Sequence, residues 1–146
     1  MTLKKSEDLL SFLGLDQEYI KESLSTGHII EAIQLLHSEL EALIRLLFTI
    51  SFKVKKTVED KKQTIESANE LKYHSLSNAL FIANIISRKQ FDNLILCNKL
   101  RNRITHRLFE QKYDGEDNKI RKSECIRVAK IGLELMDELT CKIESI

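Results

Sequence analysis

The chain contains no proline, and this absence narrows the range of folds it can adopt more than any other feature. Its 146 residues also include only four glycines, although an average usage of about 5% would supply several prolines. Folds rich in β-strands need frequent tight turns, which glycine and proline largely provide. The sequence therefore favours long helices joined by few connections. Its length fits one domain, residues 1–146, with enough chain for a hydrophobic core.

Composition places the chain among globular proteins, because 42% of its residues are hydrophobic, 31% are charged and the net charge is +1. No apolar run near the N-terminus resembles a signal peptide. The longest charge-free stretch, residues 73–87, is too short and too polar to cross a bilayer. Cys97, Cys125 and Cys141 lack C-x-x-C spacing and are expected to be buried, reduced thiols. We expect a cytoplasmic protein with no membrane association, no metal and no cofactor.

One long periodic segment dominates the helical pattern. Its apolar residues recur at spacings of three and four and predict a helix over residues 28–54, about 40 Å long. These residues are Ile29, Ile33, Leu36, Leu40, Leu43, Leu47 and Ile50. Similar patterns predict a helix over residues 90–112 and a last helix from residue 119.

The connecting regions are assigned from local signals. Residues 55–63 are charged and aperiodic and predict a loop. The capping box at residues 67–70 predicts the start of a helix that reaches residue 86, with a break near residue 74 as an alternative. Residues 113–118 form the clearest turn.

Two short helices, over residues 6–14 and 16–27, are predicted at the N-terminus. Together these elements predict an all-α fold. Its expected form is an up-and-down bundle of four main helices with a short N-terminal helical pair.

Residues 100–107 concentrate the side chains that can do chemistry. Between residues 88 and 107 there are six basic residues and one acid, a local balance of +5. The planar guanidinium of arginine can donate two hydrogen bonds to one phosphate, and histidine titrates near neutral pH. However, Arg101 and His106 are five residues apart, which leaves them about 140° apart on an ideal helix. Either the helix is distorted near His106, or a second copy of the chain completes the site.

The segment from Leu100 to His106 resembles the signature of the HEPN superfamily, an Arg, a polar residue, three further residues and a His. The helical bundle and the late position of the motif are also similar to that family. The resemblance implies a homodimer with facing motif helices and a metal-independent ribonuclease activity. It implies that His106 is the general acid or base and Arg101 stabilises the phosphate charge. Asn102 would orient His106 or a phosphate oxygen.

Other cationic residues of this helix are assigned a supporting role. Lys99, Arg103 and Arg107 are candidate substrate-binding residues that would steer phosphate. One position departs from the nucleotidyltransferase-paired toxins of the family, which often carry a tyrosine two residues after the His. Here that residue is Leu108, which makes this type of pairing less expected.

A second family gives an alternative function. The mannitol operon repressor family has a similar segment without established catalysis, and Ile104-Thr105-His106 fits either family. The two hypotheses are therefore an RNA-cleaving or RNA-binding toxin or defence factor, and a non-catalytic helical regulatory or binding module. Expected partners are a second copy of the chain, RNA, and an antitoxin or regulatory protein.

The remaining polar candidates are given structural roles. His28, His37 and His74 lack the spacing of a metal cluster and are assigned to packing or surface positions. Glu39 and Glu41 flank an apolar stripe and are expected on a solvated helix face, from which one could reach the motif.

Overall fold

The computed structural model describes residues 17–53, 57–109 and 120–146, and in these ranges it contains α-helices and no strands. This confirms the all-α prediction. The finer prediction, an up-and-down bundle of four main helices with a short N-terminal pair, is not confirmed: two helices lie between residues 57 and 86, where one was predicted, and the described ranges contain six helices. They are α2 (Gln17–Ser25), α3 (Ile29–Lys53), α4 (Val58–Glu70), α5 (Tyr73–Ile82), α6 (Arg88–Phe109) and α7 (Lys122–Glu144).

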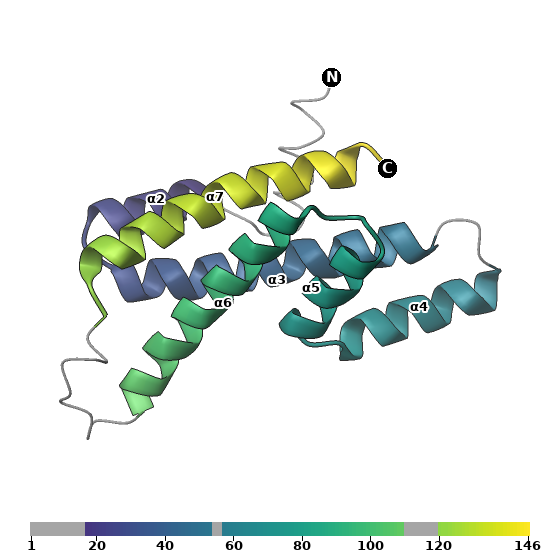
Figure 1. The fold of residues 1–146 in the computed structure, drawn as a ribbon, viewed down its shortest axis with the longest axis horizontal. Coiled ribbons are helices and arrows are strands. Elements are labelled where there is room, and N and C mark those ends of the chain that lie inside the picture. The colour runs from purple at the N-terminus through teal and green to yellow at the C-terminus, as the bar shows by residue number, and fades with distance from the viewer. Residues whose placement is uncertain (1–16, 54–56, 110–119) are drawn as a thin grey trace.

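Helix α3 is the centre of the fold and contacts each of the other five described helices. Figure 1 shows it running through the middle, with α2 and α7 along one side and α6 crossing it obliquely. The apolar stripe predicted from the sequence is confirmed as the buried face of α3, because Leu36, Leu40 and Leu43 are completely or almost completely buried. Burial of a leucine side chain stabilises the fold by about 1.5–3 kcal/mol. The length of this stripe explains why one helix can organise all the others.

Helices α3 and α7 approach each other closely at one glycine. A methyl group added at Gly132 would clash with the side chain of Leu36 on α3. Around this contact α7 buries Ala129, Leu133 and Met136, as its periodicity predicts. The small residue therefore allows the two long helices to pack closely at this point.

The prediction of a loop over residues 55–63 is wrong, because α4 begins at Val58. Thr57 is its N-cap, and the Thr57 hydroxyl accepts a hydrogen bond of 3.2 Å from the backbone N–H of Asp60. Two acids in the first turn, Glu59 and Asp60, suit the positive end of the helix dipole. The charge run belongs to a polar helix face, so a lack of apolar periodicity did not indicate a loop.

The helix start predicted at residues 67–70 is also wrong, since these residues form the last turn of α4. The Arg45 guanidinium of α3 donates to the carbonyl oxygens of Ala68 and Leu71, at 2.7 and 2.9 Å. Glu41 holds the other end of the guanidinium at 2.7 Å. A tertiary contact thus satisfies carbonyls that the helix end leaves open. The chain resumes as α5 at Tyr73, close to the alternative break near residue 74.

The predicted helix to residue 86 ends earlier, at Ile82. Asn84 adopts a positive φ of 59°, in the left-handed region that asparagine tolerates better than most residues. A true capping box follows. The backbone N–H of Gln90 donates to the Ser87 hydroxyl at 3.1 Å, and the backbone N–H of Ser87 donates to the Gln90 side chain at 3.0 Å. This box starts α6 at Arg88, two residues before the predicted position.

The prediction for the second short helix is confirmed by α2. It ends at Ser25, and Gly27, which follows, has a positive φ of 84°. The first short helix, over residues 6–14, and the turn at residues 113–118 lie outside the described residues. The description of α6 reaches Phe109 and the chain resumes at Ile120, so the helices that pack against the motif are described.

Candidate functional site

The motif lies in the last three turns of α6, which is α-helical without interruption from Arg88 to Phe109. The distortion that would bring Arg101 and His106 together within one chain is therefore not present. Their side chains leave the helix about 140° apart. Arg101 is half-buried, whereas His106 is exposed.

The Arg101 side chain turns toward α3 and is held by two amide oxygens. Its Nε donates to Gln34 Oε1 at 3.4 Å, and its Nη1 donates to Asn102 Oδ1 at 3.3 Å. The Gln34 amide nitrogen in turn donates to the Thr105 hydroxyl at 3.3 Å. Thr105 then donates to the backbone carbonyl of Arg101 at 2.9 Å. These bonds connect the motif directly to the central helix.

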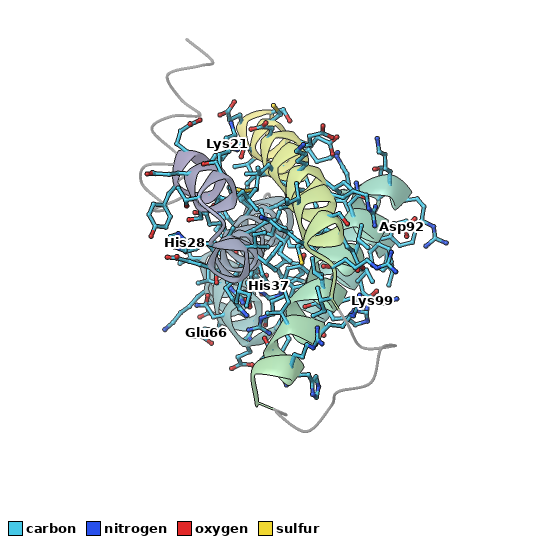
Figure 2. All side chains as sticks on the ribbon, turned by 90° about the vertical axis from the view of Figure 1, so that its left-hand side faces the viewer. Lys21, His28, His37, Glu66, Asp92 and Lys99 are labelled. Carbon is cyan, nitrogen blue, oxygen red and sulfur yellow. The ribbon has the colours of Figure 1, made fainter. Side chains whose placement is uncertain are left out.

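A second polar contact joins the same two helices one turn away. With Asn98 Oδ1 facing the ring, His37 Nε2 carries the hydrogen and donates to it at 2.9 Å. The ring is buried and stacks on Tyr73, with centroids 4.6 Å apart, and the Tyr73 hydroxyl donates to the carbonyl of Leu94. Figure 2 shows His37 among the helices and Lys99 on the outer side of α6. We name the residues that join α3 to α6 the polar seam: Gln34, His37, Asn98, Arg101 and Thr105.

Burial controls the ionisation of the groups in and beside the polar seam. It lowers the pKa of His37, an effect strengthened by the nearby charge of Arg101 and opposed by the hydrogen bond to Asn98 and by Glu41. Burial also raises the pKa of the Tyr73 hydroxyl well above its usual value. His37 is therefore neutral near pH 7 and acts in the seam as a hydrogen-bond donor.

Arg101 and Arg103 have partners of different charge. In residues 17–53, 57–109 and 120–146, no carboxylate lies within ion-pair distance of Arg101, whose two acceptors are neutral. By contrast, Arg103 forms an ion pair of 2.9 Å with Glu124 of α7. The charge of Arg101 is therefore available to an incoming anion, while that of Arg103 is partly neutralised.

The exposed face of α6 carries His106 together with Lys99, Asn102 and Arg103. Lys99 and His106 are seven residues apart, so they differ by about 20° around the helix and about 10 Å along it. The side chains on this face are cationic or polar, as phosphate binding requires. Asn98 does not share this face, since its side chain hydrogen-bonds to His37 in the polar seam.

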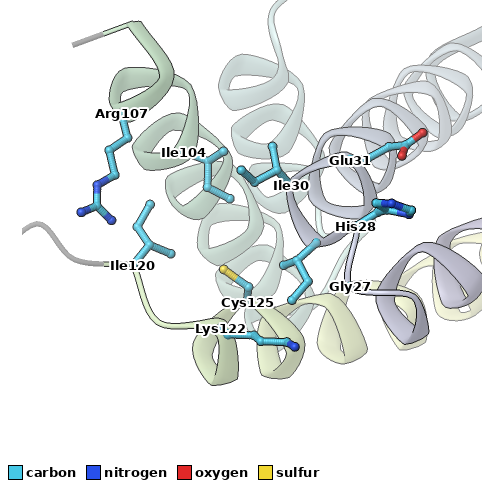
Figure 3. A pocket seen from close by; sticks show the side chains of 10 residues that line it. Gly27, His28, Ile30, Glu31, Ile104, Arg107, Ile120, Lys122 and Cys125 are labelled. Carbon is cyan, nitrogen blue, oxygen red and sulfur yellow. The ribbon is translucent and has the colours of Figure 1, made fainter. Parts of the chain in front are cut away.

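Arg107 occupies a different position, at the end of a pocket formed by the α2–α3 connection and by α3, α6 and α7 (Figure 3). The pocket has a volume of about 910 Å³. Much of its lining is apolar, with Ile30, Ile104, Ile120 and Cys125 contributing side chains. Of the three predicted phosphate-steering residues, Lys99 and Arg103 share the face of His106, and Arg107 lines this pocket.

The other predicted candidates have mixed outcomes. In the part of the chain that the structure describes, no group of three or more His, Cys, Asp or Glu residues is placed to hold a metal ion. Cys97 and Cys125 are buried as expected, and burial raises the pKa of Cys97 to about 12. Cys141 is exposed, contrary to the prediction. None of the described helices is both long and apolar enough to cross a membrane.

The sequence interpretation missed the α3 side of the site. Gln34 and His37 lie three residues apart, a helical spacing that puts both on one face beside the apolar stripe. That spacing was the available signal, because polar residues on an inward face need partners. The expectation that Glu39 and Glu41 form a solvated face is wrong: Glu39 is buried and Glu41 is half-buried against Arg45. His28 and His74 are exposed, as expected.

Comparison of the chain with protein-family models, with curated proteins and with solved structures found no match. The resemblance of residues 100–106 to the HEPN signature therefore stays a prediction.

Proposed function

We propose that this chain is a HEPN-type helical protein that binds and cleaves RNA without a metal ion, as a homodimer acting in the cytoplasm. The observation that carries the proposal is the state of Arg101. Its guanidinium is held by two neutral oxygens and has no carboxylate partner in the described residues, while His106 is exposed on the same helix. A fixed cation and an accessible histidine are the two groups that metal-free RNA cleavage needs.

In the proposed reaction, His106 removes the proton of a ribose 2′-hydroxyl. The 2′-oxygen forms a bond to the adjacent phosphorus, and the bond from phosphorus to the 5′-oxygen of the next nucleotide breaks. The leaving oxygen takes a proton from water, and the product carries a 2′,3′-cyclic phosphate. Arg101 stabilises the negative charge that gathers on the phosphate oxygens. Lys99 and Arg103 steer the RNA backbone along the exposed face, and Arg107 adds positive charge near its end.

The proposal includes two chains because α6 is regular. Arg101 and His106 leave the helix in different directions, so one protomer does not present both to one phosphate. Two copies with facing α6 helices would pair the Arg101 of each with the His106 of the other. The HEPN-type bundle of four main helices is the fold that this pairing presumes. An antitoxin or regulatory protein would then act by covering the same face.

A non-catalytic binding module, similar to the mannitol operon repressors, is the second candidate. One observation favours it: Arg101 donates a hydrogen bond to Gln34 of α3, and Thr105 and Asn98 make further contacts with α3. In this reading the motif serves helix packing, and the exposed cations bind a partner. The two candidates predict different behaviour with RNA.

The test is an RNA cleavage assay with end-labelled RNA in the presence of EDTA. We expect the unmodified protein to cleave and the R101A and H106A variants to lose about 10²-fold or more of the rate. Matched controls are R127A and H74A, which remove an exposed arginine of α7 and an exposed histidine of α5. Intact RNA in all samples would overturn the nuclease proposal and leave the binding module. Cleavage that stops on chelation would overturn the metal-free mechanism.

Mixing the two inactive variants tests the composite site. A dimer with R101A in one subunit and H106A in the other keeps one complete Arg–His pair across the interface. Random exchange makes half of the dimers mixed, so about a quarter of the unmodified activity should return. No recovery after verified subunit exchange would contradict a site shared in this way. A strictly monomeric mass with full activity would do the same.

A further inference from the structure

We infer that Gln34 is a positioning residue, which holds the Arg101 guanidinium through a closed ring of hydrogen bonds in the orientation that meets an RNA phosphate. The inference rests on the proposed function and extends the site to α3. The ring has three links. Arg101 Nε donates to Gln34 Oε1 at 3.4 Å, Gln34 Nε2 donates to the Thr105 hydroxyl at 3.3 Å, and Thr105 donates to the Arg101 carbonyl at 2.9 Å.

The ring uses both ends of the Gln34 amide. Its oxygen can only accept and its nitrogen can only donate, so the two contacts together define which way the amide faces. Thr105 anchors the donor end to the helix that carries Arg101. The acceptor end then points at Arg101 Nε, the nitrogen nearest the side-chain stem. Holding Nε sets the plane of the guanidinium and does not occupy its two outer nitrogens, one of which, Nη1, donates to the exposed Asn102 Oδ1.

Gln34 belongs to a part of α3 that is packed into the hydrophobic core. Gln34 lies on α3, next to Ile33 and two residues before Leu36, which are 2% and 1% exposed. The His37–Asn98 hydrogen bond, one turn further along, aligns α3 and α6 a second time. An arginine free in solvent loses much rotational freedom when it grips a phosphate. In the seam much of this loss occurs on folding, so RNA binding need not supply it.

The neutral charge of Gln34 is as important as its position. A glutamate at the same place would still accept from Arg101, but it would also neutralise the guanidinium, as Glu124 does for Arg103. An amide orients the arginine without competing with phosphate for its charge. Gln34 therefore has two separate properties, the orientation it gives to Arg101 and its own lack of charge, and two substitutions can test them independently.

The experiment compares Gln34→Met, which removes both hydrogen bonds, with Gln34→Glu, which keeps an acceptor and adds charge. The matched control is Gln63→Met, which replaces an exposed glutamine of α4. We expect Gln34→Met to lower kcat about tenfold or more with little change in the salt dependence of RNA binding. We expect Gln34→Glu to reduce the slope of log affinity against log salt by about 0.7, the loss of one phosphate contact to single-stranded RNA.

A measurement without RNA keeps this inference separate from the proposed function. The NMR signal of the Arg101 Nε–H should exchange faster with water in Gln34→Met than in unmodified protein and in Gln63→Met. Thr105→Val breaks the ring at another link and should show the same change if Gln34→Met does not fold. An unchanged signal and unchanged kcat in folded variants would overturn the inference. A changed signal in a protein that neither binds nor cleaves RNA would instead overturn the proposed function alone.

Discussion

Arg101 and Arg103 lie two residues apart on α6 but belong to different environments. Arg101 faces α3, is half-buried and is bonded to neutral oxygens. Arg103 faces α7 and pairs with Glu124, with 44% and 33% of the two side chains exposed. The difference shows that a basic run does not assign equal roles to its members. The helices packed on each side decide which arginine is bonded to neutral oxygens and which is paired with a carboxylate.

The largest effect on stability is expected from the polar seam. Asn98→Ala leaves the buried N–H of His37 without its acceptor, and an unsatisfied buried group costs about 1–3 kcal/mol. Glu124→Ala, on the α7 side, exposes Arg103 to water and should cost less than about 1 kcal/mol. Urea unfolding of both variants at pH 7.5 gives the two values. Equal losses would show that the two sides of α6 do not differ in the way we describe.

A smaller effect is expected from pH. Because the folded protein holds the pKa of His37 below 6.5, the unfolded chain binds its proton first as pH falls. The stability that neutral His37 contributes is complete above pH 6.5 and is lost as pH falls from there through the folded pKa. His37→Phe keeps an aromatic ring against Tyr73 but cannot titrate. Its unfolding free energy should therefore decline less between pH 7.5 and 5 than that of the unmodified protein. An identical decline in the two proteins would exclude His37 as the source.

The smallest effect is expected from the Arg103–Glu124 pair itself. A double-mutant cycle with Arg103→Met and Glu124→Gln should give a coupling of about 0.2–1 kcal/mol, as is usual for an exposed pair. In 1 M salt the screening length falls to about 3 Å, and most of the coupling should disappear. A coupling above this range that persists in high salt would mean that Arg103 is as firmly held as Arg101.

Much of the helical layout could be predicted from local pattern. The periodicity of Ile33, Leu36 and Leu40 predicted α3, and similar patterns predicted α6 and α7, because a buried face repeats with the helical turn. The errors occurred where a helix has few apolar residues or where a distant side chain ends it. Helix α4 buries only Thr64 and Ala68, and its C-terminal carbonyls are satisfied by Arg45 from another helix.

The candidate site was predictable on one side only. Arg101, Asn102 and His106 could be selected because they lie close in sequence and their chemistry suits phosphate. Their partners could not be selected in the same way. The hydrogen bond from Arg101 to Gln34 joins residues 67 positions apart, and that from His37 to Asn98 joins residues 61 apart. Sequence spacing within one helix contains no information on such contacts.

The sequence by itself determined that this chain is helical, that α3 is its longest apolar helix, and that basic side chains are concentrated in residues 88–107. These properties follow from periodicity and side-chain type, which are local. Only the tertiary structure decided that Arg101 turns inward to a neutral glutamine, that Arg103 is paired with Glu124, and that His106 is exposed on another face. The physical reason is that the charge available at a side chain depends on its neighbours in space, and those neighbours come from helices far away in the chain.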